Sequence, residues 1–185
     1  MKAGVLALQG DFREHARVFA EAGASPVEVR TPDDLAEVAC LAIPGGESTT
    51  IGKLARANDL VDPIRERAAA GMPILGTCAG MIVLAKEVAG GEPLFALMDI
   101  GVRRNAYGRQ VDSFETDVAV EGLDHRVRGV FIRAPVVDRV GPGVRVLAEH
   151  EGDPVVLEEG SLVVASFHPE LVGETGIHRY VMGKV

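Results

Sequence analysis

The segment PILGTCAGM, residues 73–81, indicates most clearly how this chain folds. Its apolar first part predicts a buried strand and the residues after Gly80 predict a helix, so Cys78 falls at the junction. Such a tight turn leaves no room for side chains two positions before and after the cysteine, which accounts for Gly76 and Gly80. Unpaired N–H groups at the helix start favour a thiolate. The segment therefore predicts a nucleophilic cysteine; the alternative is a small buried one.

Strand and helix patterns alternate through the first half of the chain. The other apolar runs predict strands at residues 4–8, 27–29 and 40–43. Helices are predicted at 12–22, where Asp11 and Glu14 form a possible capping box, in a brief turn from Thr31, and from Asp62 to Gly71. This alternation is typical of a mostly parallel central sheet covered on both faces, an α/β three-layer sandwich.

The second half of the chain is richer in strands and less regular. Short strands are predicted at residues 118–120, 129–132, 144–147, 155–157 and 162–167, and a last helix is predicted from near 176 to 181. No linker separates the halves, so we expect one domain over residues 1–185.

Composition limits the class of protein. With 185 residues and 47% hydrophobic content the chain can bury a sizeable core, and a formal charge of -8 argues against nucleic acid or an anionic membrane as partner. Polar residues 9–11 interrupt the first apolar stretch, and no run has the length of a membrane span. Cys40 lies in a predicted core strand, so a disulfide with Cys78 is not expected. We therefore expect a cytoplasmic protein.

A second chemical signal, SFHPE at residues 166–170, directly follows the last predicted strand. A cysteine nucleophile needs a base, and that base needs an acceptor on its other nitrogen; His168 and Glu170 can supply both. In an extended chain the two side chains would lie on one side, with Pro169 stiffening the link. Cys78, His168 and the loop after residue 43 all follow strands, and parallel sheets gather such ends at one edge. A Cys-His-Glu triad is the expected arrangement.

The chain resembles the class I, triad-type glutamine amidotransferases, whose fold is flavodoxin-like. The resemblance runs nearly end to end and rests on these stretches: GVLALQG at 4–10, REH at 13–15, PGGESTT at 44–50, GTCAG at 76–80, RN at 104–105, GRQVDSF at 108–114, FIRAP at 131–135 and SFHPE at 166–170. The stretches at 44–50, 108–114 and 131–135 resemble one branch in particular, the glutaminases that serve pyridoxal 5′-phosphate synthase.

The resemblance implies hydrolysis of L-glutamine to glutamate and ammonia. Cys78 would attack the carboxamide, His168 would pass a proton to the departing ammonia, and Glu170 would orient His168. Backbone N–H groups of Gly46 and Ala79 are the candidate donors to the oxyanion.

The resemblance also assigns residues around the substrate. Gly46, Glu47 and Ser48 would line the glutamine site, and Arg104, Ile132 and Arg133 match its remaining positions. Outside the family match, both arginines would be interpreted as solvated surface charges. Gln9 matches a position linked to partner contact and to activation of the oxyanion hole.

A partner follows from the same resemblance: a synthase subunit that takes up the ammonia, in a hetero-oligomeric complex that makes pyridoxal 5′-phosphate. We expect the chain itself to bind no cofactor and no metal, since the sequence has no P-loop and no Cys/His cluster at zinc spacing. We also expect low activity until the partner docks and the Gly45-Gly46 loop takes its working shape.

Three other interpretations stay open at this point. The chain could be the glutaminase of another synthase, a cysteine peptidase or DJ-1-like cysteine hydrolase, or a non-catalytic assembly module. The branch-specific stretches argue against the first, His168-Pro169-Glu170 against the second, and the intact triad positions against the third.

Overall fold

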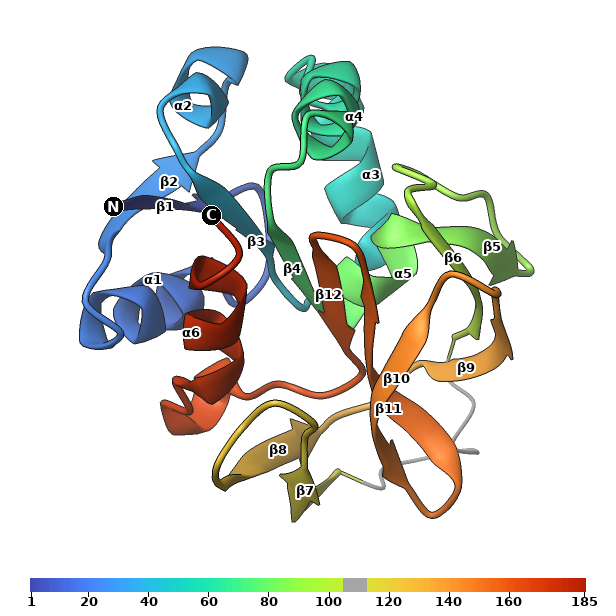
Figure 1. Cartoon of the computed structure of the whole chain (residues 1–185). Helices are drawn as coiled ribbons and strands as arrows, with labels where there is room; N and C mark the ends of the chain where they lie inside the picture. The colour runs from blue at the N-terminus through green and yellow to red at the C-terminus, as the bar shows by residue number, and fades with distance from the viewer. Residues whose placement is uncertain (105–112) are drawn as a thin grey trace.

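A seven-stranded sheet forms the centre of the molecule in the computed structural model, which describes residues 1–104 and 113–185 (Figure 1). The part of the family resemblance at 105–112 lies outside the described residues. The strand order is β10-β11-β12-β4-β3-β1-β2. The bounds are β1 Lys2–Leu6, β2 Ser25–Val29, β3 Cys40–Ile43, β4 Ile74–Thr77, β10 Arg145–His150, β11 Asp153–Glu159 and β12 Leu162–Ala165.

The sheet is mostly parallel, as predicted. Strands β2, β1, β3, β4 and β12 run parallel to one another, whereas β11 pairs antiparallel with both β12 and the edge strand β10. The four-residue strands β3, β4 and β12 are buried at every position, which explains their continuous apolar sequences.

Helices cover both faces of this sheet and complete the predicted three layers. They are α1 Phe12–Glu21, α2 Pro32–Ala36, α3 Ser48–Ala57, α4 Val61–Ala69, α5 Ala79–Leu84 and α6 Gly176–Met182, with a short 3-10 turn η1 at Glu170–Val172. Leu41 and Ile43 pack into the cluster that contains residues of α2 to α5, whereas Cys40 and Ala42 pack into the cluster that contains residues of α1 and α6. This alternation divides the core into two layers.

Two smaller sheets lie beside the central one (Figure 1). One contains β5 Ala85–Ala89, β6 Met98–Arg103 and β9 Val136–Val140, and the other pairs β7 Phe114–Ala119 with β8 Arg126–Phe131. The sequence patterns missed α3, β5, β6 and β9. The helix after Cys78 ends at Leu84, because Ala85 already has the extended conformation that opens β5.

Three neighbouring strands bring the predicted site residues together. Thr77, the last residue of β4, is in register with Ala165, the last residue of β12, and β3 lies on the other side of β4. The backbone N–H of Cys78 donates to the Ala165 carbonyl at 2.8 Å. The segments that follow these strands therefore meet at one edge of the sheet.

Among residues 1–104 and 113–185, every helix is too short or too polar to cross a membrane.

Candidate active site

Cys78 occupies a strained turn between β4 and α5. Its backbone has φ 49° and ψ −102°, a conformation that residues other than glycine rarely adopt. A Cβ on Gly76 would lie 2.7 Å from the carbonyl carbon of Gly80, and a Cβ on Gly80 would overlap the carbonyl oxygen of Ile43. The predicted steric need for glycine at both positions is therefore confirmed.

The imidazole of His168 and the carboxylate of Glu170 are in direct contact, as predicted. Nδ1 of His168 lies 2.8 Å from Oε1 of Glu170, and both residues are buried. The backbone N–H of His168 donates to the Val130 carbonyl at 2.8 Å, which anchors the segment to β8. The expected extended link was wrong: Pro169 has helical angles, φ −69° and ψ −28°, and Glu170 opens the turn η1. The bend brings Glu170 back onto the ring.

Charge at the site is set by burial and by these contacts. Burial alone would lower the pKa of His168, but hydrogen bonds with Asp11, Cys78 and Glu170 outweigh it and raise the pKa to about 12. Burial would likewise raise the pKa of Glu170, yet His15 and His168 hold it below its usual range. The site therefore combines a protonated imidazole with a buried carboxylate beside the Cys78 thiol.

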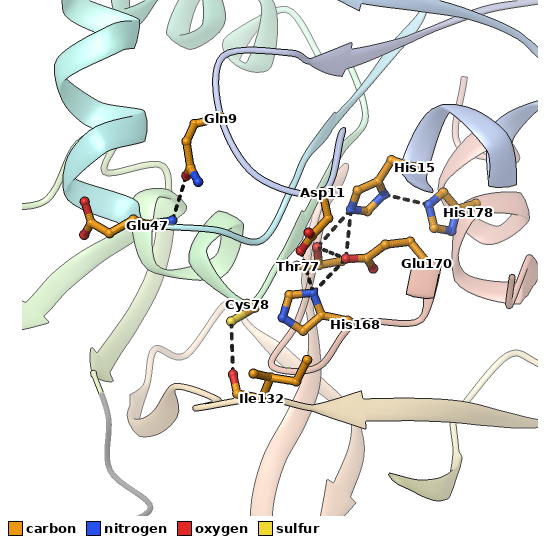
Figure 2. A network of polar contacts seen from close by, with 10 residues as sticks. All are labelled: Gln9, Asp11, His15, Glu47, Thr77, Cys78, Ile132, His168, Glu170 and His178. Carbon is orange, nitrogen blue, oxygen red and sulfur yellow. Dashed lines mark hydrogen bonds and ion pairs between the residues drawn. The ribbon is translucent and has the colours of Figure 1, made fainter. Parts of the chain in front are cut away.

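Asp11 differs from its expected role. Its side chain makes no capping bond to α1; its Oδ2 lies 3.4 Å from Nδ1 of His168 instead. Asp11, His168 and Glu170 each offer an atom that could ligate a metal, all within 4.8 Å of one another. The same atoms are already paired with one another, because both carboxylates contact Nδ1 of His168 (Figure 2). The group is therefore explained without a metal.

The loop after β3 lies against the start of α1. The Gly45 carbonyl accepts from the backbone N–H of Asp11 at 3.2 Å, and a Cβ on Gly45 would overlap Cε1 of His168. Gly46 has φ 142°, and a Cβ there would overlap the side-chain oxygen of Gln9. That oxygen accepts from the backbone N–H of Glu47 at 2.7 Å (Figure 2). Gln9 thus fixes the loop that carries a candidate oxyanion donor.

A pocket of about 620 Å³ opens in front of Cys78, a size within the roughly 300–1,000 Å³ usual for small-molecule sites. Its lining residues are Asp11, Gly46, Glu47, Ser48, Cys78, Ala79, Ile82, Arg104, Ser113, Ile132, Arg133, His168 and Leu171. Every predicted substrate residue and both oxyanion candidates belong to this lining. Gln9 and Glu170 do not; Gln9 contacts the loop and Glu170 lies behind His168.

The two walls of the pocket are held by backbone geometry. The Ile132 carbonyl lies 3.9 Å from Sγ of Cys78, and Arg133 has a positive φ of 47°. Opposite them, Glu47 caps α3 by accepting from the backbone N–H groups of Thr49 and Thr50 at 3.0 and 2.7 Å. Its hydrogen bonds, first that with the Thr50 hydroxyl, lower the pKa of Glu47 to about 2. Glu47 therefore presents a fixed negative charge at the pocket.

Sequence patterns did not identify the polar residues behind the triad. Figure 2 shows His15 beside Thr77 and Glu170, with His178 next to His15, and neither histidine is among the residues that line the pocket. His15 belongs to the REH stretch of the resemblance but was given no role, because its contacts come from distant parts of the chain. The only signal was its spacing from Val18 and Phe19, which places it on the buried face of α1.

A cysteine on a strand-to-helix turn, a His-Glu pair at the next strand end and a mostly parallel sheet define the glutamine amidotransferases of class I. Comparison with protein families agrees, since the profile described as the SNO glutamine amidotransferase family matches residues 5–185. The chain belongs to the SNO glutamine amidotransferase family.

Similar proteins cover nearly the whole chain. A protein of a Parafrankia species is 54% identical over 96% of this chain and 90% of its own length. A protein of Pelotomaculum thermopropionicum is 52% identical over 100% of this chain and 95% of its own length. Both are named pyridoxal 5′-phosphate synthase subunit PdxT. A crystal structure of a glutamine amidotransferase, 49% identical, superposes with a TM-score of 0.94 over 98% of this chain and 97% of that one. The fold is shared by a chain of PurLQS from Thermotoga maritima, which is 18% identical. It superposes with a TM-score of 0.70 over 99% of this chain and 95% of that one.

Proposed function

We propose that this chain hydrolyses L-glutamine to L-glutamate and ammonia and delivers the ammonia to a synthase subunit that makes pyridoxal 5′-phosphate. The observation that carries the proposal is Cys78 in one pocket with His168, which is backed by Glu170 at 2.8 Å. The relatives named pyridoxal 5′-phosphate synthase subunit, 52 to 54% identical, support the choice of partner. In this proposal residues 1–185 act as one glutaminase domain.

Cys78 is the nucleophile. Its thiolate sulfur bonds to the carboxamide carbon of glutamine, and the carbonyl electrons move to the oxygen. His168, protonated at the nitrogen facing the substrate, gives its proton to the departing amine, and the C–N bond breaks to release ammonia and leave a γ-glutamyl thioester. His168 then takes a proton from water as the water oxygen bonds to the thioester carbon. The C–S bond breaks, and glutamate and the thiolate are released.

The tetrahedral intermediates need donors for a negatively charged oxygen. The backbone N–H of Ala79, first in α5, has no partner within its own helix, and Gly46 stands across the pocket. Losing one such donor typically costs on the order of 100-fold or more in rate. Gln9 and Asp11 hold the Gly45-Gly46 loop by its neighbouring backbone groups, so a partner that shifts Gln9 would reshape the oxyanion site.

Charged residues of the lining suit the two ends of the substrate. The negative charge of Glu47 fits the α-ammonium group, and Arg104 or Arg133 fits the α-carboxylate through paired hydrogen bonds. Arg104 donates to the Thr49 hydroxyl at 3.3 Å, which holds it against the first turn of α3, the helix that Glu47 caps. Ser48 and Ile132 complete the glutamine site in this proposal. No cofactor or metal is required, because every proton and electron pair in the reaction comes from the triad, glutamine and water.

The partner reaction explains why the two subunits would form a hetero-oligomer. Ammonia released into cytoplasmic water would be protonated and lost as a nucleophile, whereas a docked synthase receives it directly. The proposed glutaminase is therefore most active in the complex.

The test is glutamate release from L-glutamine by the chain alone and with the synthase subunit. Cys78→Ala is expected to abolish release in both samples, and Cys40→Ala, which alters a fully buried cysteine remote from the pocket, serves as the matched control. Stimulation by the partner is expected for the wild type and the control. Glutamate release that survives Cys78→Ala would overturn the mechanism, and release unaffected by the synthase would overturn the partner-dependent activation.

A further inference from the structure

Two histidines are completely buried behind the proposed triad. His15 on α1 and His178 on α6 are both 0% exposed, and Nδ1 of His15 lies 2.8 Å from Nε2 of His178. The other ring nitrogen of His15 lies 3.0 Å from the Thr77 hydroxyl and 3.4 Å from Oε1 of Glu170. Burying two imidazoles is costly unless their polar atoms have partners, so this arrangement needs an explanation.

Hydrogen-bond roles around Oε1 of Glu170 fix the direction of these contacts. An ionised carboxylate only accepts, and the pKa of Glu170 is held below its usual range. His168 therefore donates from Nδ1 at 2.8 Å, and the Thr77 hydroxyl donates at 3.4 Å. Since the Thr77 proton points to Glu170, its oxygen accepts from His15.

A bare Nε2 would also place its lone pair 3.4 Å from the ionised Oε1 of Glu170, so these contacts favour a proton on Nε2 of His15. This holds whether the ring is neutral, with His178 donating to Nδ1, or cationic. The N–H faces Thr77 and, more weakly, Oε1 of Glu170, the same carboxylate oxygen that holds His168 (Figure 2). His15 thus supports Glu170 from the side opposite the catalytic ring.

We propose that His15 is a positioning residue for glutamine hydrolysis: its Nε2–H, directly and through the Thr77 hydroxyl, holds Glu170 where it orients His168. The inference rests on the proposed function. It adds His15 to the three residues of the triad, as a side chain that does not touch the substrate. The alternative explanation is purely structural: His15 and His178 would only fill space between α1 and α6.

Two substitutions at one position separate these explanations. The side-chain nitrogen of glutamine reaches about as far as Nε2 of histidine, whereas that of asparagine reaches about as far as Nδ1. His15→Gln therefore keeps a donor toward Thr77 and Glu170, and His15→Asn keeps only the contact toward His178. Both remove the ring and leave a similar packing defect, so they form a matched pair.

The measurement is steady-state glutaminase kinetics in the complex with the synthase subunit, with the thermal unfolding midpoint recorded for each variant. His15→Asn is expected to lower kcat by about 10- to 100-fold, the effect of one hydrogen bond to a charged group, with KM changed less than about threefold. His15→Gln is expected to recover most of that loss. A purely structural role predicts equal kcat for the two variants at equal unfolding midpoints, and that result would overturn the proposal.

The pH dependence of Cys78 alkylation by iodoacetamide gives a second readout that packing alone would not move. A misplaced Glu170 supports the His168 imidazolium less well, so the profile of His15→Asn is expected to shift and that of His15→Gln to stay near the wild type. Unshifted profiles in both variants would count against the proposal.

A measurement on the unaltered protein covers the case in which both variants fail to fold. Imidazole ¹⁵N NMR of the wild type distinguishes protonated from bare ring nitrogens. A proton on Nε2 of His15 is expected, and an unprotonated Nε2 would overturn the inference. Failure of the proposed function looks different: glutamate release that is absent in the wild type or survives Cys78→Ala.

Discussion

The carboxylate of Asp11 lies 3.4 Å from Nδ1 of His168, the nitrogen that also contacts Glu170 at 2.8 Å. One imidazole thus faces two carboxylates from opposite ends of the chain. Burial opposes a charge on the ring, and the hydrogen bonds with Asp11, Cys78 and Glu170 overcome it and raise the pKa of His168 to about 12. Asp11 therefore favours the protonated form of His168, the form that we propose protonates the leaving amine.

Asp11→Asn is expected to lower the pKa of His168, because the neutral amide keeps the shape of Asp11 and removes its charge. A proton donor works below its pKa, so the alkaline limb of the kcat/KM profile should move to lower pH. Rates across the pH range check this. Asp33→Asn, an exposed aspartate on α2, is the control for loss of one charge and should leave the limb in place. Identical alkaline limbs in wild type and Asp11→Asn would contradict the assignment.

The two cysteines should differ sharply in reactivity. Cys40 is 0% exposed and burial raises its thiol pKa to about 11, whereas Cys78 lines the pocket. In the folded protein we expect iodoacetamide to modify Cys40 about 100-fold more slowly than Cys78, or slower still. Peptide mapping by mass spectrometry measures both rates. In urea the rates should converge; comparable rates in the native state would rule out this environment for Cys40.

Local sterics explain why the tight turn that carries Cys78 could be predicted from the sequence. A Cβ on Gly76 would clash with the backbone of Gly80 in the same turn, and a pattern of neighbouring residues can reveal such a requirement. The clash at Gly80 is instead with Ile43 on the adjacent strand β3, a contact that the local pattern does not show. The strand ends were predictable as well, because β3, β4 and β12 are buried on both faces and therefore read as continuous apolar runs.

Residues whose roles depend on distant partners were not predictable. Asp11 has the position of a helix cap, but its side chain faces His168 instead. His15 and His178 are 163 positions apart, and only packing of α1 against α6 brings them together. Helix α3 was missed for a different, local reason: its cap is Glu47, and the serine and threonines that follow are weak helix formers.

Gly80→Ala tests the steric argument directly. The added methyl group would overlap the Ile43 carbonyl oxygen, which is backbone and cannot rotate away, so we expect destabilisation by about 1–3 kcal/mol or more and loss of glutaminase activity. Gly52→Ala is the matched control, since a Cβ there meets nothing closer than 3.4 Å and the residue lies within α3. It should be neutral or stabilise by about 0.5–1 kcal/mol. Urea unfolding measures both, and equal stabilities would refute the steric requirement.

His178 should make stability fall in mild acid. Burial, together with the charge of His15, lowers the pKa of His178 to about 3, against about 6.5 in an unfolded chain. As the pH falls from 6.5 the unfolded state binds this proton first, so folding free energy is lost through the window from about 6.5 to 3. The free energy of unfolding falls by up to about 1.4 kcal/mol per pH unit where the unfolded state binds one proton more than the folded state.

His178→Gln removes the titrating ring, so the free energy of unfolding should depend less steeply on pH between about 6 and 4.5 than in the wild type. His125→Gln provides a control of opposite sign, because hydrogen bonds with Asp124 and Glu174 raise the pKa of that exposed histidine. Its contribution is fully present below the unfolded pKa of about 6.5 and is lost only as the pH rises above that value, so His125→Gln should leave the slope between about 6 and 4.5 nearly unchanged. Urea unfolding at several pH values tests both, and parallel curves for wild type and His178→Gln would show that His178 is not held neutral by the fold.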